Sequence, residues 1–208
     1  MALIASDRRT LIVGLGATGL SCVRHCHALG RQLAVADSRA QPPGLAEVRE
    51  RWPDLEVVTG AFDPDWFCGF DELIVSPGIS LDEPAIAAAA EAGVRISGDL
   101  DLFREAVAAP VVAITGSNGK STVTTLLGQM AAEAGVNAGV GGNLGTPALD
   151  LIAPDVPLYI LEVSSFQLER TTDLKAEVAT VLNVSDDHMD RYPDRMSYFQ
   201  AKHRIFQG

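Results

Sequence analysis

The stretch ITGSNGKST at residues 114–122 determines the fold of the region around it. It follows the apolar, β-branched run 111–114, which predicts a strand, and precedes a helix-forming run that begins near Ser121. A strand, a glycine-containing loop, Gly-Lys-Ser and a helix are the layout of a loop that binds nucleotide phosphates. The strict form of this loop has a glycine five residues before Gly119, where Ile114 stands, so this is the shorter variant Thr-Gly-x-x-Gly-Lys-Ser.

The residue types of this loop suit a chain of phosphates. Small residues let backbone N–H groups approach phosphate oxygens, Lys120 neutralises charge, and the hydroxyl of Ser121 can hold Mg²⁺. A glycine turn without a ligand is the alternative. The candidate phosphate-binding residues are Gly116, Ser117, Asn118, Gly119, Lys120, Ser121 and Thr122.

Acidic residues follow two later strands. The apolar run 158–161 predicts a strand that ends at Glu162, and an acid at this place is the usual second ligand of Mg²⁺ in P-loop enzymes. The alternative is an acid that favours the N-terminus of the next helix. The polar stretch DDHMDR at 186–191 follows the predicted strand 178–182, and its side chains suit either a metal site or solvated helix caps.

Upstream of residue 109, predicted strands and helices alternate in a first α/β unit. GLGATG at 14–19 fits G-x-G-x-x-G between the strand 11–13 and the first helix, and Asp37 ends the second strand. This pattern predicts a Rossmann-like domain that accepts a diphosphate at a helix N-terminus. NAD(P) or FAD, another nucleotide and a purely structural turn all remain open. SPG at 76–78 follows the fourth strand, at the same edge of the predicted sheet. It is either a contact for the ligand or a turn without a ligand.

The predicted fold class is therefore α/β, with a Rossmann-like N-terminal domain at residues 1–108 followed by a P-loop-type central domain at 109–208. Further strands are predicted at 33–36, 56–58, 73–75 and 94–96. The central domain shows only about three clear strands, because 139–145 (GVGGNLG) resembles a glycine-dense loop, and we expect this domain to be incomplete.

Composition excludes several classes of protein. The 208 residues carry a net charge of −11, which argues against a nucleic-acid partner. No secretory signal and no apolar run of membrane-spanning length is visible. Three cysteines do not suggest a disulfide framework, so the cytoplasm is expected. Cys22 and Cys26, with His25 and His27 beside them, are interpreted as packing thiols and a surface histidine rather than a metal site.

Two basic residues have no special role on the sequence pattern alone. Lys202 lies in the last predicted helix, 194–207, where it is expected to be an exposed helical lysine. Arg39 is interpreted as a surface charge.

Taken together, the motifs resemble those of the Mur ligases, and most closely the members that add D-glutamate. The resemblance runs the whole length of the sequence. The phosphate loop is shared across the family and with folylpolyglutamate synthetase, whereas SSFQL is much more specific to the D-glutamate-adding members. The matching segments are GLGATG at 14–19, DSR at 37–39, SPGI at 76–79, GDLDLF at 98–103, the loop at 115–122, GGNLG at 141–145, LEVSSFQL at 161–168 and DHMDRY at 187–192.

This resemblance implies a UDP-substrate site in the first domain, since the family's Rossmann-like domain binds the UDP of the substrate rather than NAD. Asn143 and His188 are implied to face the muramoyl part of that substrate. The implied UDP-binding residues are Ala17, Thr18, Ser38, Arg39, Ser76, Pro77 and Gly78.

In the central domain the resemblance implies that residues 116–122 bind ATP. The implied Mg²⁺ ligands are Ser121, Glu162 and His188. Lys202 matches the family lysine that CO₂ carbamylates, and this conversion of a cation into an anion can help to position Mg²⁺. The implied catalytic residues are Lys120, His188 and Lys202.

The implied activity is that of an ATP-dependent amide ligase of peptidoglycan synthesis, which adds D-glutamate to UDP-N-acetylmuramoyl-L-alanine through an acyl phosphate. A cytoplasmic monomer is expected. The family has a third, carboxyl-terminal domain that contributes to binding ATP and D-glutamate. Nothing in this sequence corresponds to it, so we expect residues 1–208 alone to be inactive. The alternatives are an NAD(P)-dependent oxidoreductase, based on 14–19 and Asp37, and a UDP- and ATP-binding module without catalysis.

Overall fold

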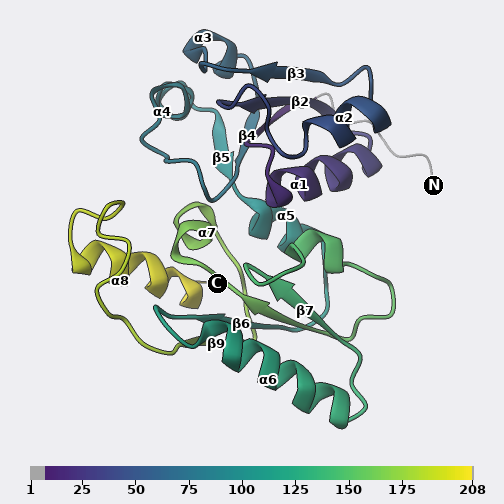
Figure 1. The fold of residues 1–208 in the computed structure, drawn as a ribbon, viewed down its shortest axis with the longest axis vertical. Helices are drawn as coiled ribbons and strands as arrows, with labels where there is room; N and C mark the ends of the chain where they lie inside the picture. Colours follow the sequence, from purple (N-terminus) through teal and green to yellow (C-terminus); the bar gives the residue numbers. More distant parts are fainter. Residues whose placement is uncertain (1–7, 208) are drawn as a thin grey trace. The chain divides into compact units, whose positions relative to one another are not determined.

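The computed structural model describes residues 8–207, which form two α/β units divided between Asp99 and Leu100 (Figure 1). Both contain a parallel sheet, as the continuous apolar strands predict. Among the described residues, no helix is long and apolar enough to cross a membrane.

The first unit is a five-stranded parallel sheet in the order β3-β2-β1-β4-β5. All five predicted strands are confirmed. The strands are β1 (Arg9–Val13), β2 (Gln32–Asp37), β3 (Glu56–Thr59), β4 (Glu72–Val75) and β5 (Arg95–Ser97). The helices of this unit are α1 (Ala17–Ala28), α2 (Leu45–Arg51), α3 (Pro64–Phe67) and α4 (Pro84–Glu91), of which α2 and α3 are too short to be visible as a pattern in the sequence. The next helix, α5 (Asp99–Ala106), lies in the second unit except for its first residue.

The strand order reverses between β1 and β4, and this switch point is where open α/β sheets bind ligands. β1 and β4 are buried along almost their whole length, with Leu11, Val13, Leu73 and Val75 in one apolar cluster. The glycine loop after β1 and the Ser-Pro-Gly turn after β4 therefore lie side by side at the carboxyl edge of a rigid core.

The three glycines of the first loop have different surroundings. Gly14 has a φ of +95°, which favours glycine over any other residue. A Cβ on Gly16 would meet nothing within 4 Å, so the backbone there is open to a ligand. A Cβ on Gly19 would overlap the carbonyl group of Gly14, so α1 packs directly on the turn. These are the roles that each glycine of a dinucleotide-type loop is expected to have.

This difference makes Gly19→Ala a test of the loop geometry. We expect it to destabilise the first unit by about 3 kcal/mol, because the methyl group has to displace backbone. Gly16→Ala is the matched control and should cost about 1 kcal/mol or less. Urea unfolding followed by circular dichroism measures both, and equal stabilities of the two variants would contradict the packing described for Gly19.

The second unit is a four-stranded parallel sheet in the order β7-β8-β6-β9. In Figure 1, α6 lies on one side of this sheet, and α7 and α8 lie on the other. The strands are β6 (Val111–Thr115), β7 (Ala138–Gly142), β8 (Leu158–Glu162) and β9 (Val178–Val181). The helices are α6 (Lys120–Glu133), α7 (Ser165–Arg170) and α8 (Arg195–His203), with 3₁₀ turns η1 (Ala148–Leu151) and η2 (Arg204–Phe206).

The prediction of a glycine-dense loop at 139–145 is wrong for its first part, because β7 covers Ala138–Gly142 and pairs with β8. The glycines are there for close packing. A Cβ on Gly139 would lie 2.7 Å from the ring of Tyr159, and one on Gly142 would lie 2.5 Å from the carbonyl oxygen of Glu162. A strand built from small residues lacks the β-branched pattern by which strands are identified.

The division between the units falls at the start of α5 because this helix packs on the second unit. The ring of Phe103 meets Tyr159 edge-on, with centroids 5.0 Å apart, and the Asp101 carboxylate accepts a 2.8 Å hydrogen bond from the Thr172 N–H. The boundary predicted at residues 108–109 falls after α5, just before β6.

Candidate functional site

In the first unit, Asp37 organises the carboxyl edge of the sheet. Its Oδ2 accepts hydrogen bonds from Leu15 N (2.7 Å) and Arg39 Nη2 (2.6 Å), and its Oδ1 accepts from Arg39 N (2.9 Å) and Arg39 Nε (2.8 Å). Burial works to raise the pKa of Asp37, but the bonds from Arg39 and Leu15 outweigh it and hold this pKa below its usual range. Asp37 therefore stays ionised and ties the glycine loop to Arg39.

These bonds bear on the choice of nucleotide. Both oxygens of Asp37 are engaged by protein donors and the residue is buried, so it is poorly placed to hold a ribose hydroxyl as in NAD-binding proteins. Arg39, expected to be an ordinary surface charge, forms an ion pair with Asp37, and its side chain remains 52% exposed. The arrangement therefore favours a nucleotide whose phosphates bind to Arg39. It does not favour a dinucleotide whose ribose hydroxyls bind to Asp37.

The other implied UDP-binding residues gather at the same edge. Ser76 donates from Oγ to the Gly14 carbonyl (3.1 Å), which fastens the Ser-Pro-Gly turn to the glycine loop. Ala17 and Thr18 begin α1, whose N-terminus has no side-chain cap and no acidic residue in its first turn. Ser38 follows β2 directly. Such an uncapped helix N-terminus is suited to an anion.

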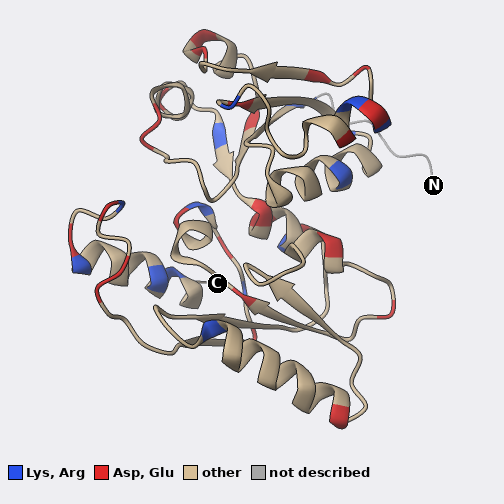
Figure 2. Ribbon diagram, viewed as in Figure 1, with Lys and Arg blue, Asp and Glu red and all other residues tan. Residues whose placement is uncertain are grey.

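In the second unit, the phosphate-loop sequence forms a tight turn onto α6. Gly119 caps the helix with a φ of +81° and no side-chain cap bond. Charged residues stand only at the two ends of α6, Lys120 at the start and Glu133 at the end (Figure 2). A lysine beside the positive end of the helix dipole is unfavourable unless an anion binds there, so the local charge itself indicates an anion site.

Two lysines converge on this loop. Lys120 Nζ donates to the carbonyls of Gly116 (2.8 Å) and Ser117 (3.0 Å), and Lys202 Nζ donates to the same Gly116 carbonyl (2.9 Å). The expectation of an exposed Lys202 is wrong, because the residue is only 1% exposed. It shares a helix face with buried Tyr198, and its ammonium lies 4.5 Å from the centroid of that ring. Burial and the charge of Lys120 lower the pKa of Lys202 to about 8.

Glu162 is the centre of a second polar group. Its carboxylate accepts from Ser121 Oγ (2.6 Å) and from Asn143 Nδ2 (2.6 Å), and its backbone carbonyl accepts from Asn143 N (2.8 Å). Glu162 is buried at the carboxyl end of β8. The structure thus brings together Ser121, Glu162 and Asn143 from three separate segments.

His188 lies in a different environment. Its ring contacts Phe166 and Tyr198, with centroids 4.8 Å and 6.0 Å away, and its backbone has a φ of +55°. Within residues 8–207, no group of three or more His, Cys, Asp and Glu side chains is placed to hold a metal ion. The acids of 186–191 do not form a metal site by themselves: Asp187 accepts from the His188 N–H, and Asp186 lies 3.6 Å from Arg195.

The structure adds residues that the sequence pattern did not single out. Asn183 follows β9 and bonds to the phosphate loop, and Tyr198 Oη lies 3.1 Å from Ser117 Oγ. The available signal for Asn183 was a polar residue at the end of the apolar run 178–182. Cys22 and Cys26 are buried on α1 and form no disulfide, consistent with packing.

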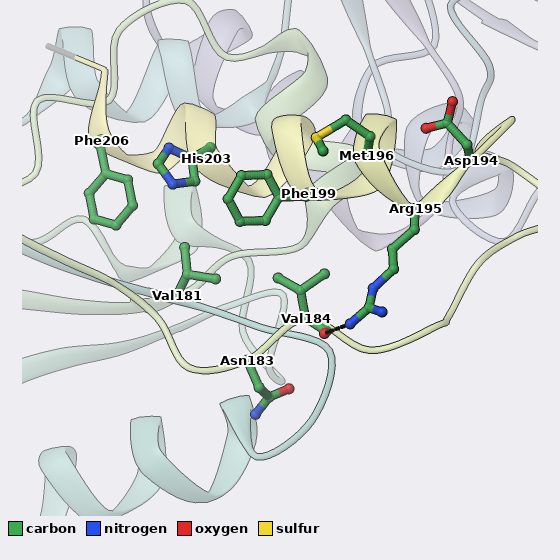
Figure 3. Close-up of a pocket in the computed structure, with 9 residues that line it drawn as sticks. All are labelled: Val181, Asn183, Val184, Asp194, Arg195, Met196, Phe199, His203 and Phe206. Atoms are coloured by element: carbon green, nitrogen blue, oxygen red, sulfur yellow. Dashed lines mark hydrogen bonds between the residues drawn. The ribbon is translucent and has the colours of Figure 1, made fainter.

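A groove of about 880 Å³ runs between β9 and α8, beside Asn183 (Figure 3). Its walls are mostly apolar, and the exposed side chains of Met196, Phe199 and Phe206 lie in it. The Asn183 side chain points away from these aromatic rings in Figure 3.

Comparison with protein families assigns both units. A family profile described as "Mur ligase MurD-like, N-terminal domain" matches residues 8–98, and one described as "Mur ligase middle domain" matches residues 114–208. Proteins named UDP-N-acetylmuramoylalanine–D-glutamate ligase from Marinobacter nauticus and Pseudomonas aeruginosa are 66% and 58% identical over all 208 residues. The chain spans about half the length of these relatives, 47% and 46% respectively.

Solved structures agree on the fold. UDP-N-acetylmuramate:L-alanyl-gamma-D-glutamyl-meso-diaminopimelate ligase from Neisseria meningitides matches with a TM-score of 0.60 at 16% identity, covering 96% of this chain and 68% of that one. UDP-N-acetylmuramate-alanine ligase from Thermotoga maritima matches with a TM-score of 0.55 at 19% identity, covering 96% of this chain and 47% of that one. At these identities the similarity is one of fold.

Proposed function

Because the chain belongs to the Mur ligase family and carries its MurD-like N-terminal domain and its middle domain, we propose that it supplies the nucleotide-binding units of an ATP-dependent amide ligase. The proposed reaction adds D-glutamate to UDP-N-acetylmuramoyl-L-alanine in peptidoglycan synthesis, as the names of its relatives suggest. The observation that carries the proposal is the pair of uncapped helix N-termini after glycine loops, one in each unit, each with a basic side chain close by.

The first unit is proposed to bind the UDP of the substrate. The glycine loop and the N-terminus of α1 suit the diphosphate, and Arg39, held by Asp37, supplies a positive charge. Ser76 is fixed against the loop by its bond to Gly14. The proposed contacts are Ala17, Thr18, Ser38, Arg39, Ser76, Pro77 and Gly78, within a domain at residues 1–108.

The second unit contains the proposed central domain, residues 109–208, which is proposed to bind ATP through residues 116–122. Lys120 and Ser121 begin α6, so their N–H groups have no partner within the helix and can meet phosphate oxygens. Lys120 Nζ would exchange its two carbonyl partners for phosphate oxygens. Asn143 and His188 are proposed to face the muramoyl part of the substrate.

The side chains around Glu162 fit a magnesium ion. A serine hydroxyl and a buried carboxylate lie 2.6 Å apart after the phosphate loop, and oxygen donors of this kind are the ones that Mg²⁺ prefers. Ser121 and Glu162 would hold the ion, with His188 and carbamylated Lys202 as further proposed contacts. When bound, Mg²⁺ supplies positive charge that offsets the negative charge of the phosphates.

The proposed chemistry is positioning and charge neutralisation. The alanyl carboxylate attacks the γ-phosphorus of ATP, ADP leaves, and an acyl phosphate forms. The amine of D-glutamate then attacks the acyl carbon and inorganic phosphate leaves. Lys120 neutralises the phosphoryl group in transfer, which matters because two negative charges about 4 Å apart repel by about 4 kcal/mol at intermediate dielectric.

We also propose a cytoplasmic monomer that binds neither nucleic acid nor membrane. The net charge of −11 opposes attraction to a polyanion. The described cysteines form no disulfide, as is usual in a reducing compartment.

Calorimetric titration of this chain tests the assignment of one nucleotide to each unit. We expect binding of UDP and of ATP, and no binding of NADH. Arg39→Met should weaken UDP about tenfold or more, because a charged hydrogen bond to phosphate is lost, and should leave ATP binding unchanged. Tight binding of NADH without binding of UDP would favour the oxidoreductase alternative and overturn the proposal.

A further inference from the structure

The side chain of Asn183 forms a two-way pair with the backbone of Asn118 in the phosphate loop. Asn183 Oδ1 accepts from Asn118 N (2.9 Å), and Asn183 Nδ2 donates to the Asn118 carbonyl (2.9 Å). We propose that Asn183 is a positioning residue, which holds this loop in the shape that binds phosphate. This inference rests on the proposed binding of ATP by residues 116–122.

The pair is part of a seam along which the loop is fastened. The pairing of β6 with β9 continues past both strands, through Leu182 N to the Thr115 carbonyl (2.9 Å) and Ser117 N to the Asn183 carbonyl (3.0 Å). Beyond Asn183, the N–H of Ser185 donates to Ser117 Oγ (3.0 Å). The loop therefore follows the segment 182–185 residue by residue.

The hydrogen bonds of this seam determine which backbone N–H groups of the loop remain available to bind a ligand. The N–H groups of Ser117 and Asn118 are committed to Asn183, one to its backbone and one to its side chain. The next amides, at the start of α6, are those that lack an intrahelical partner. Asn183 fixes the peptide groups on both sides of Asn118 and so sets the direction of the turn through Gly119. The direction of this turn determines where the N–H groups at the start of α6 point.

Asn183 is not a core residue. It and Asn118 are both exposed to solvent, so neither side chain belongs to the buried core of the unit. A change at Asn183 should therefore affect the loop much more than the stability of the unit. Backbone amides that are already held in place bind phosphate without the free-energy cost of ordering the loop. If the Asn183–Asn118 hydrogen bonds are lost, the loop has to become ordered when the ligand binds, and this cost weakens the affinity.

The test compares Asn183→Ala with Arg195→Ala in this chain. Arg195 is the matched control, because its guanidinium donates to the Val184 carbonyl (2.9 Å) in the same segment without touching the loop (Figure 3). ATP and inorganic tripolyphosphate are titrated by calorimetry, and UDP serves as the reference ligand of the first unit. Hydrogen exchange at the Asn118 amide reports on the pair without any ligand.

We expect Asn183→Ala to bind ATP and tripolyphosphate roughly tenfold more weakly. The variant loses the two hydrogen bonds to Asn118, and each such bond makes a modest net contribution to the free energy. UDP binding and the melting temperature should be unchanged, and the Asn118 amide should exchange faster. Arg195→Ala should match the wild type in every measurement.

The outcomes separate the two claims. If wild-type chain fails to bind ATP, the proposed function fails and this inference falls with it. If the wild type binds ATP and Asn183→Ala binds it equally well, only the role of Asn183 is overturned. A loss of affinity in Arg195→Ala as large as that in Asn183→Ala would also overturn it, because any disturbance of the segment would then suffice.

Discussion

Replacing Lys120 with alanine should reduce ATP-dependent phosphate release by the full-length protein roughly 10³-fold or more. The ammonium group stands at the uncapped start of α6 and is the proposed neutraliser of the transferred phosphoryl group. The release assay uses ATP, UDP-N-acetylmuramoyl-L-alanine and D-glutamate. Calorimetry on residues 1–208 should show weakened ATP binding and intact UDP binding.

Lys175→Ala is the matched control for this variant. Lys175 carries the same charge in the same unit, and it is an exposed partner of Asp173, with Nζ 2.6 Å from Oδ2. Its removal should leave phosphate release unchanged. A Lys120→Ala protein that retained wild-type turnover would remove this residue from the proposed chemistry. The loop should stay folded in Lys120→Ala, since its fastening to Asn183 and Ser185 does not involve Lys120.

Lys202→Ala should be nearly inactive, with a loss of roughly 10²-fold or more, because alanine cannot form the proposed carbamate that would help to position the proposed Mg²⁺. Carbamylation needs the neutral amine, and a pKa of about 8 makes that form accessible near neutral pH. Added formate or acetate should restore part of the activity by supplying a carboxylate in the space left by the side chain. Steady-state rates with and without these carboxylates measure the effect.

Lys202→Arg is the companion variant, since it keeps the positive charge but cannot be carbamylated. It should be as inactive as Lys202→Ala, without rescue, because the longer side chain leaves no room. ¹³C NMR of the wild-type chain in ¹³C-labelled bicarbonate should show a carbamate signal that both variants lack. Full activity of Lys202→Ala would eliminate the carbamate from the proposed mechanism.

Much of this fold follows from local sequence patterns, because local patterns report local structure. β1, β4, β6 and β8 are short apolar runs, and each ends in a glycine, a Ser-Pro-Gly turn or an acid that marks the ligand edge of the sheet. Both glycine loops were therefore visible before any contact was known. β7 escaped because its glycines serve close packing against β8, which no periodicity reveals.

The features of the site that local sequence patterns did not predict are the burial and the partners of its residues, which depend on distant parts of the chain. Lys202 is buried only because α8 packs so that its side chain reaches Gly116, 86 residues earlier in the chain. Asn183 acts through Asn118, 65 residues away. The engagement of Asp37 by Leu15 and Arg39 likewise becomes visible only once β1 and β2 are paired. Sequence spacing locates candidates, whereas their ionisation and their partners come from tertiary structure.

Lys120 and Lys202 both donate to the Gly116 carbonyl, so two positive charges lie close together at this site. Burial and the nearby charge of Lys120 lower the pKa of Lys202, and the number of protons bound there therefore changes with folding and with ligands. In the unfolded chain Lys202 has its ordinary pKa of 10.5, against about 8 in the folded unit, so the unfolded chain holds more protons between these pH values. Stability therefore increases with pH across that window, and the cost of burying the charge is fully present below about pH 8. The negative charge of Asp187 opposes the shift only in part. A polyphosphate arriving beside Lys202 would raise its pKa again and draw a proton from the buffer, whereas carbamylation would release protons.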